Sequence, residues 1–218
     1  MTDIRSDTAA FLREVVSAAD PALPEVKDIY LESFSEEERL PAEWFDEMLS
    51  QRAVRLGAGQ PVFHLLVAES GEQVRGFITA YYYHRDRRGE VANLGFFIYL
   101  AIHACHRGQG LGTRLYRSAL DVLKLDAFLC DETLAAVIFD VESPELAPDE
   151  ENRKLRERRI ALYRRLGADY VEGAHVTYPP AREGLPELVT QPMYHAVSRC
   201  LEPEQIVRAT YSLILGRD

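Results

Sequence analysis

The chain has 218 residues, of which 47% are hydrophobic and 28% charged, a balance typical of folded globular proteins and not of disordered ones. Its formal net charge of −10 should repel phosphate backbones, and no apolar run reaches the roughly 20 residues that cross a bilayer, so we expect neither nucleic-acid nor membrane partners. The three cysteines show no paired spacing, so neither a disulfide framework nor a zinc site is indicated, and a cytoplasmic location is expected.

Three helices are predicted before the first strand. Apolar residues recur at helical spacing over residues 11–19, so residues 1–20 are expected to form an N-terminal helical extension. Two further apolar stripes of helical period follow Pro24 and Pro41. Because proline is favoured in the first turn of a helix, a helix is predicted to begin near each of them.

From residue 62 the apolar pattern changes to that of strands. Strands are predicted at residues 62–68 and 74–83, joined as a hairpin, and a charged turn is predicted at residues 85–90. A third strand, at residues 91–102, is apolar on both faces and should therefore be central and covered on both sides. These strands form an antiparallel meander.

The remaining elements alternate between helices and strands. They are predicted as a helix from residue 111, a strand at 134–141, a helix at 149–166, two strand-like pieces at 169–171 and 192–197, and a last helix from Pro203. Residues 173–190, which contain three prolines, are expected to be a loop. The helix after residue 111 is a crossover, which implies that the strands before and after it lie parallel. The sequence therefore predicts a mixed sheet flanked by helices.

The most informative segment is the loop at residues 107–113, Arg-Gly-Gln-Gly-Leu-Gly-Thr, between a buried strand and a helix. Its glycines let successive backbone N–H groups point inward, the helix start adds partial positive charge, and Arg107 adds a full one, which together form a cradle for a diphosphate. A Walker loop would need a lysine, and a dinucleotide fingerprint read from Gly108 would need glycine in place of Thr113. The pattern present is Arg-x-x-Gly-x-Gly.

That pattern, in this place, resembles the GCN5-related N-acetyltransferase (GNAT) superfamily, whose Arg/Gln-x-x-Gly-x-Gly/Ala loop binds the diphosphate of coenzyme A. Residues 100–112 match the superfamily's strand and loop, except that Ala104 replaces a usual proline. Residues 161–168, Ala-Leu-Tyr-Arg-Arg-Leu-Gly-Ala, resemble its helix end with a tyrosine before Leu-Gly, and residues 29–39 resemble the helix that edges its acceptor groove. Two motifs in the correct order make the resemblance specific.

The resemblance implies an α/β fold class of GNAT type: a mixed, mostly antiparallel sheet, flanked by helices, with a central parallel strand pair that splays apart. It also implies that residues 21–198 form the N-acyltransferase domain, between the N-terminal extension at 1–20 and a C-terminal helical extension at 199–218. The two extensions are expected either to pack together or to form the contact of a homodimer.

The resemblance further implies that acetyl-CoA is the acyl donor and lies between the splayed strands; no metal ion is expected. Main-chain groups of the strand would pair with the pantetheine arm, and those of the loop would hold the diphosphate. The implied cofactor-binding residues are Leu100, Ala101, Ile102, Arg107, Gly108, Gln109, Gly110, Leu111, Gly112 and Thr113.

Three residues are candidates for proton transfer. By its motif position Tyr163 would protonate the departing CoA thiolate, although a packed helix tyrosine is the alternative. Many members carry a glutamate that serves as the general base on the corresponding strand, but here that strand has Phe-Ile-Tyr at residues 97–99. Glu142 and Asp140, which share a face of the next strand, are therefore the candidate general bases, with Glu142 first. Each has an alternative: Glu142 could cap the following helix, Asp140 could be a buried acid with a neighbouring partner, and a water relay could serve instead.

Upstream of Tyr163, Arg156 occupies the region where an asparagine that contacts the pantetheine arm is common in the superfamily. It is expected on a solvated helix face or near a CoA phosphate. The function implied is transfer of an acetyl group to a primary amine, in a small molecule or a peptide, by direct attack in a ternary complex. The alternative is a non-catalytic CoA-binding or interaction module on the same fold.

Overall fold

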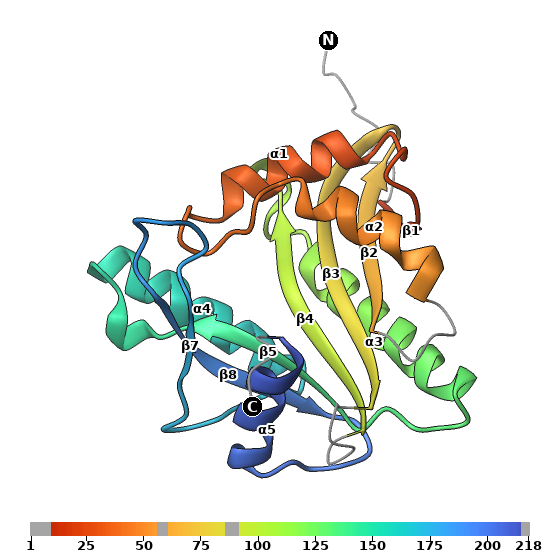
Figure 1. Cartoon of the computed structure of the whole chain (residues 1–218). Coiled ribbons are helices and arrows are strands. Elements are labelled where there is room, and N and C mark those ends of the chain that lie inside the picture. The colour runs from red at the N-terminus through yellow and green to blue at the C-terminus, as the bar shows by residue number, and fades with distance from the viewer. Residues whose placement is uncertain (1–9, 56–60, 86–91, 215–218) are drawn as a thin grey trace.

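In the described part of the chain, eight strands form a single mixed sheet, with helices on both of its faces (Figure 1). The computed structural model describes residues 10–55, 61–85 and 92–214, so the charged turn predicted at residues 85–90 lies outside the described residues apart from Arg85. The strands are β1 (Phe11–Val15), β2 (Val62–Ser70), β3 (Gln73–Arg85), β4 (Ala92–Ile102), β5 (Ala136–Glu142), β6 (Asp169–Tyr170), β7 (Val176–Tyr178) and β8 (Leu188–Ala196). The α-helices are α1 (Leu23–Ser33), α2 (Trp44–Arg55), α3 (Leu111–Leu129), α4 (Glu150–Arg165) and α5 (Pro203–Leu213).

The strand order is β1-β2-β3-β4-β5-β8-β6, and β7 pairs with β8 next to β6. All neighbours are antiparallel except β4 and β5, which are parallel, as the crossover through α3 predicts. The predicted mixed, mostly antiparallel sheet flanked by helices is thus confirmed. None of the described helices is both long and apolar enough to cross a bilayer.

The predicted N-terminal helix is wrong, because its described part forms β1. This strand pairs with the edge of β2, from Phe11 opposite Glu69 to Val15 opposite Leu65. The Arg13 guanidinium donates to the carboxylates of both Asp20 and Glu69, with N–O distances of 2.7 Å, and so fixes the strand from both ends. Pairing covers the open edge of β2, a tertiary gain that outweighs the local helical period.

The loop predicted at residues 173–190 is also partly wrong. It contains β7, which pairs with the start of β8 from Val176 opposite Thr190 to Tyr178 opposite Leu188. The prolines lie in the connection between the two strands. By contrast, the predicted last helix is confirmed as α5, and the domain boundaries remain predictions.

Each face of the sheet carries its own hydrophobic core. On one face α1 and α2 bury Tyr30 and Phe45 against the β3 side chain Phe77, and α5 joins the same core. On the other face α3 and α4 cover the centre of the sheet. The approach of α3 to β4 is close at Gly95, where an added Cβ would lie 2.4 Å from a methyl carbon of Leu123. Glycine there lets the helix pack directly on the strand.

Beside the core, a buried histidine joins three elements on the β1 side of the sheet. His64 of β2 is only 3% exposed and lies 2.6 Å from Glu14 of β1 through Nδ1 and 2.6 Å from Asp126 of α3 through Nε2. Glu14 also pairs with Arg52 of α2 at 2.7 Å. Burial alone would lower the pKa of His64, but the hydrogen bonds to Asp126 and Glu14 outweigh burial and raise it. A protonated ring donates to both carboxylates, whereas a neutral ring can donate to only one.

This contact predicts a specific pH dependence of stability. Because the pKa of His64 is higher in the folded than in the unfolded chain, the contribution is fully present below about pH 6.5 and is lost as the pH rises through the folded-state value. Urea unfolding should therefore show wild-type stability declining, relative to His64→Gln, as the pH rises above about 6.5. His175→Gln, which changes an exposed histidine, should follow the wild type. Parallel curves for wild type and His64→Gln would contradict this assignment.

Candidate active site

The glycine loop sits between β4 and α3 and presents unpaired backbone N–H groups. Gly108 and Gly110 have φ of 78° and 77°, the left-handed region, and Gly110 is the N-cap of α3. The N–H groups of the first helical turn, residues 111–113, have no acceptor within a helix, and none donates to another described residue. Arg107 anchors the loop, since its Nε donates to the carbonyl oxygen of Ile102 at 3.0 Å. These features make a site for an anionic group.

The strand that leads into this loop is bent away from its parallel neighbour. On its β3 side, Ile98 and Tyr99 of β4 lie opposite the single residue Thr79, whose Oγ1 accepts from the Tyr99 N–H at 3.0 Å. Such a bulge bends a strand and increases its twist. On the other side, β4 pairs with β5 only as far as Phe96 opposite Ile138. Beyond this pair the two strands separate, as the predicted splayed pair requires.

The main chain of β4 faces the opened gap at two positions. The N–H groups of Tyr99 and His103 point toward β3, to Thr79 Oγ1 and to the carbonyl oxygen of Arg75. Because main-chain groups alternate along a strand, the N–H groups of Leu100 and Ile102 point the other way, into the gap. These are the positions predicted to pair with an extended ligand.

A cleft of about 1150 Å³ runs from the glycine loop, along the gap, to the segment between α1 and α2. It is larger than the roughly 300–1,000 Å³ of a typical small-ligand pocket, so it has room for two ligands side by side. Every predicted site residue lines this cleft except Gln109, which is exposed outside it. In the described part of the chain, no cluster of three or more histidine, cysteine or acidic side chains is placed to hold a metal ion.

Tyr163 of α4 lies at the middle of the cleft, where the two strands separate. Its ring packs on Phe139 of β5, with centroids 4.7 Å apart, and on Tyr116 of α3 at 6.0 Å. Burial raises the pKa of Tyr163, so the phenol stays protonated at neutral pH. The side chain is therefore a packed helix tyrosine whose protonated phenol lines the cleft.

Asp140 is a buried carboxylate with one oxygen left unpaired. Its Oδ2 accepts a hydrogen bond from the hydroxyl of Tyr178 on β7, whereas its buried Oδ1 has no partner among the described residues. Burial raises the pKa of Asp140 to about 6, and the hydrogen bond from Tyr178 opposes this rise. A group of this kind is ionised at neutral pH but has a much higher proton affinity than an exposed aspartate.

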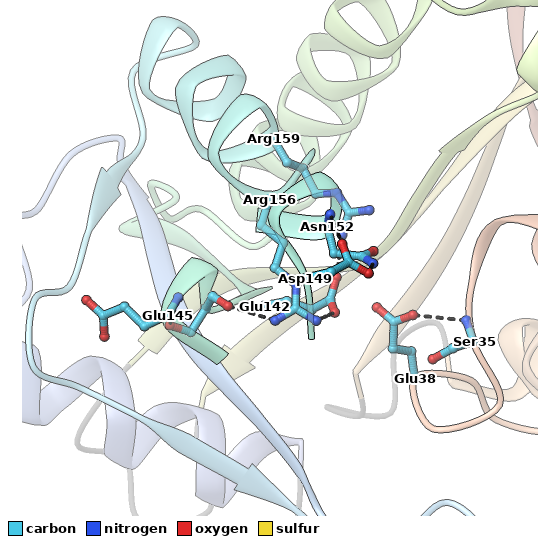
Figure 2. A network of polar contacts seen from close by, with 9 residues as sticks. Ser35, Glu38, Glu142, Glu145, Asp149, Asn152, Arg156 and Arg159 are labelled. Atoms are coloured by element: carbon cyan, nitrogen blue, oxygen red, sulfur yellow. Dashed lines mark hydrogen bonds and ion pairs between the residues drawn. The ribbon is translucent and has the colours of Figure 1, made fainter. Parts of the chain in front are cut away.

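Glu142 lies on the same face of β5 as Asp140, but its carboxylate is bound by cationic side chains (Figure 2). Its Oε1 accepts from Arg156 at 2.5 Å and its Oε2 from Arg159 at 3.0 Å. Burial and the nearby carboxylate of Glu38 raise its pKa, and the two guanidinium groups oppose that rise. Each oxygen accepts from a guanidinium group, so protonation of Glu142 would weaken both ion pairs.

Two expectations about this cluster are therefore wrong. Arg156 lies neither on a solvated face nor toward the glycine loop, because it donates to Glu142 and to the carbonyl oxygen of Ser143 at 2.7 Å. Glu142 does not cap α4, because Asp149 is the N-cap and accepts from the N–H of Asn152. The N-terminus of α4 is already capped by Asp149, and the carboxylate of Glu142 instead pairs with two arginines of the same helix.

Two cleft residues were not singled out by the sequence. Tyr178 lies in the segment expected to be a loop, and the one signal for it is that a buried aspartate needs a hydrogen-bond donor. Glu38 lies between α1 and α2, where its Oε2 accepts from the Ser35 N–H at 2.9 Å. The hydroxyl of Tyr99 donates to the carbonyl oxygen of Glu38 at 3.2 Å, so β4 fixes this segment over the cleft.

Comparisons with known proteins agree with this geometry. The family model described as Acetyltransferase (GNAT) family matches residues 23–138, a little over half of the chain. A search of curated proteins found no match.

Solved structures extend the likeness to nearly the whole chain. A protein of Bacteroides thetaiotaomicron assigned to the GNAT family is 21% identical, with a TM-score of 0.63, and the match covers 95% of this chain and 99% of that one. A ribosomal-protein-alanine N-acetyltransferase of Brucella melitensis is 17% identical with a TM-score of 0.58, over 86% and 99% of the two chains. A Salmonella typhimurium protein assigned as an acetyltransferase, with acetyl-CoA bound, is 18% identical with a TM-score of 0.55, over 89% and 97%. At these identities the likeness concerns the fold.

The loop geometry predicts opposite effects for two neighbouring glycines. Gly110→Ala would force a side chain into a left-handed conformation and should lower the free energy of unfolding by about 1–2 kcal/mol, although space there is open. Gly112→Ala lies inside α3, where an added Cβ meets only Ile102 at 3.8 Å, and should leave stability unchanged or raise it by up to about 1 kcal/mol. Urea unfolding of both variants measures the difference. Equal effects would show that the loop does not hold this conformation in solution.

Proposed function

The chain belongs to the GNAT acetyltransferase family, and from this membership we propose that it transfers an acetyl group from acetyl-CoA to a primary amine. The observation that carries the proposal is a single cleft, in which an anion cradle, an opened parallel strand pair, a buried phenol and a buried carboxylate follow one another. Each of these features matches one requirement of acyl transfer from a long anionic thioester to an amine.

The donor would lie along the cleft from the glycine loop to Tyr163. The free N–H groups at the start of α3 and the side chain of Arg107 suit the diphosphate, since both are preorganised and face the cleft. The N–H groups of Leu100 and Ile102 suit the amides of the pantetheine arm and would orient the thioester carbonyl. A backbone donor aimed at that carbonyl stabilises the oxyanion that develops when the amine attacks.

Proton transfers would then fall to two side chains. The amine nitrogen bonds to the thioester carbon, and Asp140 Oδ1 takes the proton that the nitrogen releases. The carbon–sulfur bond breaks, and the hydroxyl of Tyr163 protonates the departing thiolate. We place Asp140 ahead of Glu142 as general base because its Oδ1 is free and its pKa is about 6, whereas Glu142 is held by two arginines.

The first test is direct binding of acetyl-CoA by titration calorimetry. We expect one site per chain, weakened about tenfold or more by Arg107→Gln, since a hydrogen bond to a charged group contributes about 1.5–3 kcal/mol. Arg117→Gln, which removes an exposed arginine of α3 outside the cleft, should bind as the wild type does. No binding by the wild-type protein would overturn the proposal, and tight binding without transfer to any amine would favour a non-catalytic CoA-binding module.

The second test is the pH dependence of the reaction. A base works only when deprotonated, so kcat/KM should fall as the pH drops through about 6, and Asp140→Asn should remove that limb and lower kcat by about 10²- to 10⁴-fold. The hydrogen bond from Tyr178 lowers the pKa of Asp140, so Tyr178→Phe should move the limb to higher pH. Glu142→Gln should keep the limb in place. If Glu142→Gln removed the limb and Asp140→Asn did not, Glu142 would be the base.

A further inference from the structure

The end of the cleft away from the glycine loop is acidic. It is formed by the segment between α1 and α2, the last residues of β5 and the connection after β7. Five carboxylates and two guanidinium groups line this end. The carboxylates belong to Glu32, Glu37, Glu38, Asp140 and Glu142, and the guanidinium groups to Arg39 and Arg159.

Both guanidinium groups bind protein partners, although the buried Nε of Arg39 has none among the described residues. Arg39 donates from Nη1 to the carbonyl oxygen of Leu31 at 2.8 Å and pairs with Glu36, which does not line the cleft, at 3.4 Å. Arg159 donates to Glu142, which Arg156 also holds. The remaining carboxylates of this end therefore face the cleft without a cationic side chain bound to them among the described residues. An excess of negative charge in a partly enclosed cleft attracts cations.

One of these carboxylates is fixed in position by the fold. Glu38 is held by the Ser35 N–H through its side chain and by Tyr99 through its backbone carbonyl. Figure 2 shows it facing Glu142 across the cleft, from the opposite wall. Its charge raises the pKa of Glu142, which means that the space between the two walls is unfavourable for negative charge. A ligand cation placed there would relieve this repulsion.

A second, independent feature points to a ligand near the same end. The buried Oδ1 of Asp140 lacks a hydrogen-bond donor in the described part of the chain. A buried acceptor without a donor costs about 1–3 kcal/mol, so a donor supplied by a ligand would be favoured. Asp140 and Glu142 are two residues apart on β5, or about 7 Å, and Glu38 faces Glu142. Asp140 and Glu38 thus both line this end of the cleft, close to Glu142.

We propose that the acceptor is a small aliphatic diamine or polyamine, with its reacting amine at Asp140 and a second ammonium group at Glu38. This inference rests on the proposed acetyl transfer and adds the chemical class of the acceptor. The carbon chain between the nitrogens would lie against an aromatic wall, to which Phe34, Tyr99 and Tyr178 contribute. Aromatic faces suit both methylene groups and a neighbouring cation. A carboxylate on the acceptor would instead meet Glu38 and be repelled.

The test compares three acceptors of one chain length with the full-length protein and acetyl-CoA. Putrescine carries two amines, butylamine one, and γ-aminobutyrate one amine and one carboxylate. We expect kcat/KM to be highest for putrescine and lowest for γ-aminobutyrate. Glu38→Gln should lower the putrescine-to-butylamine ratio of kcat/KM about three- to tenfold, because it removes the charge that meets the second ammonium group but keeps the acceptor for Ser35.

The matched control is Glu43→Gln, which removes an exposed negative charge from the same segment but outside the cleft and should leave the ratio as in the wild type. Equal rates for putrescine and butylamine, or an unchanged ratio in Glu38→Gln, would overturn the diamine inference while leaving acetyl transfer in place. Absence of transfer to every amine, measured with a protein that binds acetyl-CoA, would overturn both.

Discussion

The cleft exists because β4 separates from β5. Main-chain N–H and C=O groups inside a protein need partners, and parallel neighbours in a sheet normally supply them. Here the bulge at Ile98 and Tyr99 turns β4 away after Phe96, so two N–H groups face a cleft in place of a strand. The opening also places the side chains of Tyr163 and Asp140 on the lining of the cleft. A local irregularity in one strand thus creates both a binding edge and access to buried acids.

The two carboxylates at the end of β5 are the same functional group in different surroundings, and they are therefore suited to different roles. Asp140 receives one phenolic hydrogen bond and keeps a free oxygen, which leaves it able to gain and lose a proton near neutral pH. Glu142, on the same face, is bound by two arginines of α4 and ties that helix to the strand. One is suited to proton transfer and the other to holding the cleft's shape. The helix that carries Tyr163 is thereby fixed relative to β5.

Features encoded in short segments could be predicted from the sequence. The glycine loop, the crossover that makes β4 and β5 parallel, and the placement of Tyr163 near the end of α4 all depend on contiguous residues. Interactions between distant residues could not. Tyr178 is 38 residues from Asp140, and nothing near either one indicates the other. Likewise β1 has an apolar pattern compatible with a helix, and only the open edge of β2 decides the outcome.

A crystal structure with coenzyme A or acetyl-CoA bound would test this account most directly. We expect the diphosphate at the N–H groups of residues 111–113 and the pantetheine arm along Leu100 and Ile102, with its sulfur near the hydroxyl of Tyr163. A coenzyme bound elsewhere, or β4 and β5 paired along their full length in that crystal structure, would contradict this expectation. In that case the bulge, the loop and the buried phenol would be features of the fold alone.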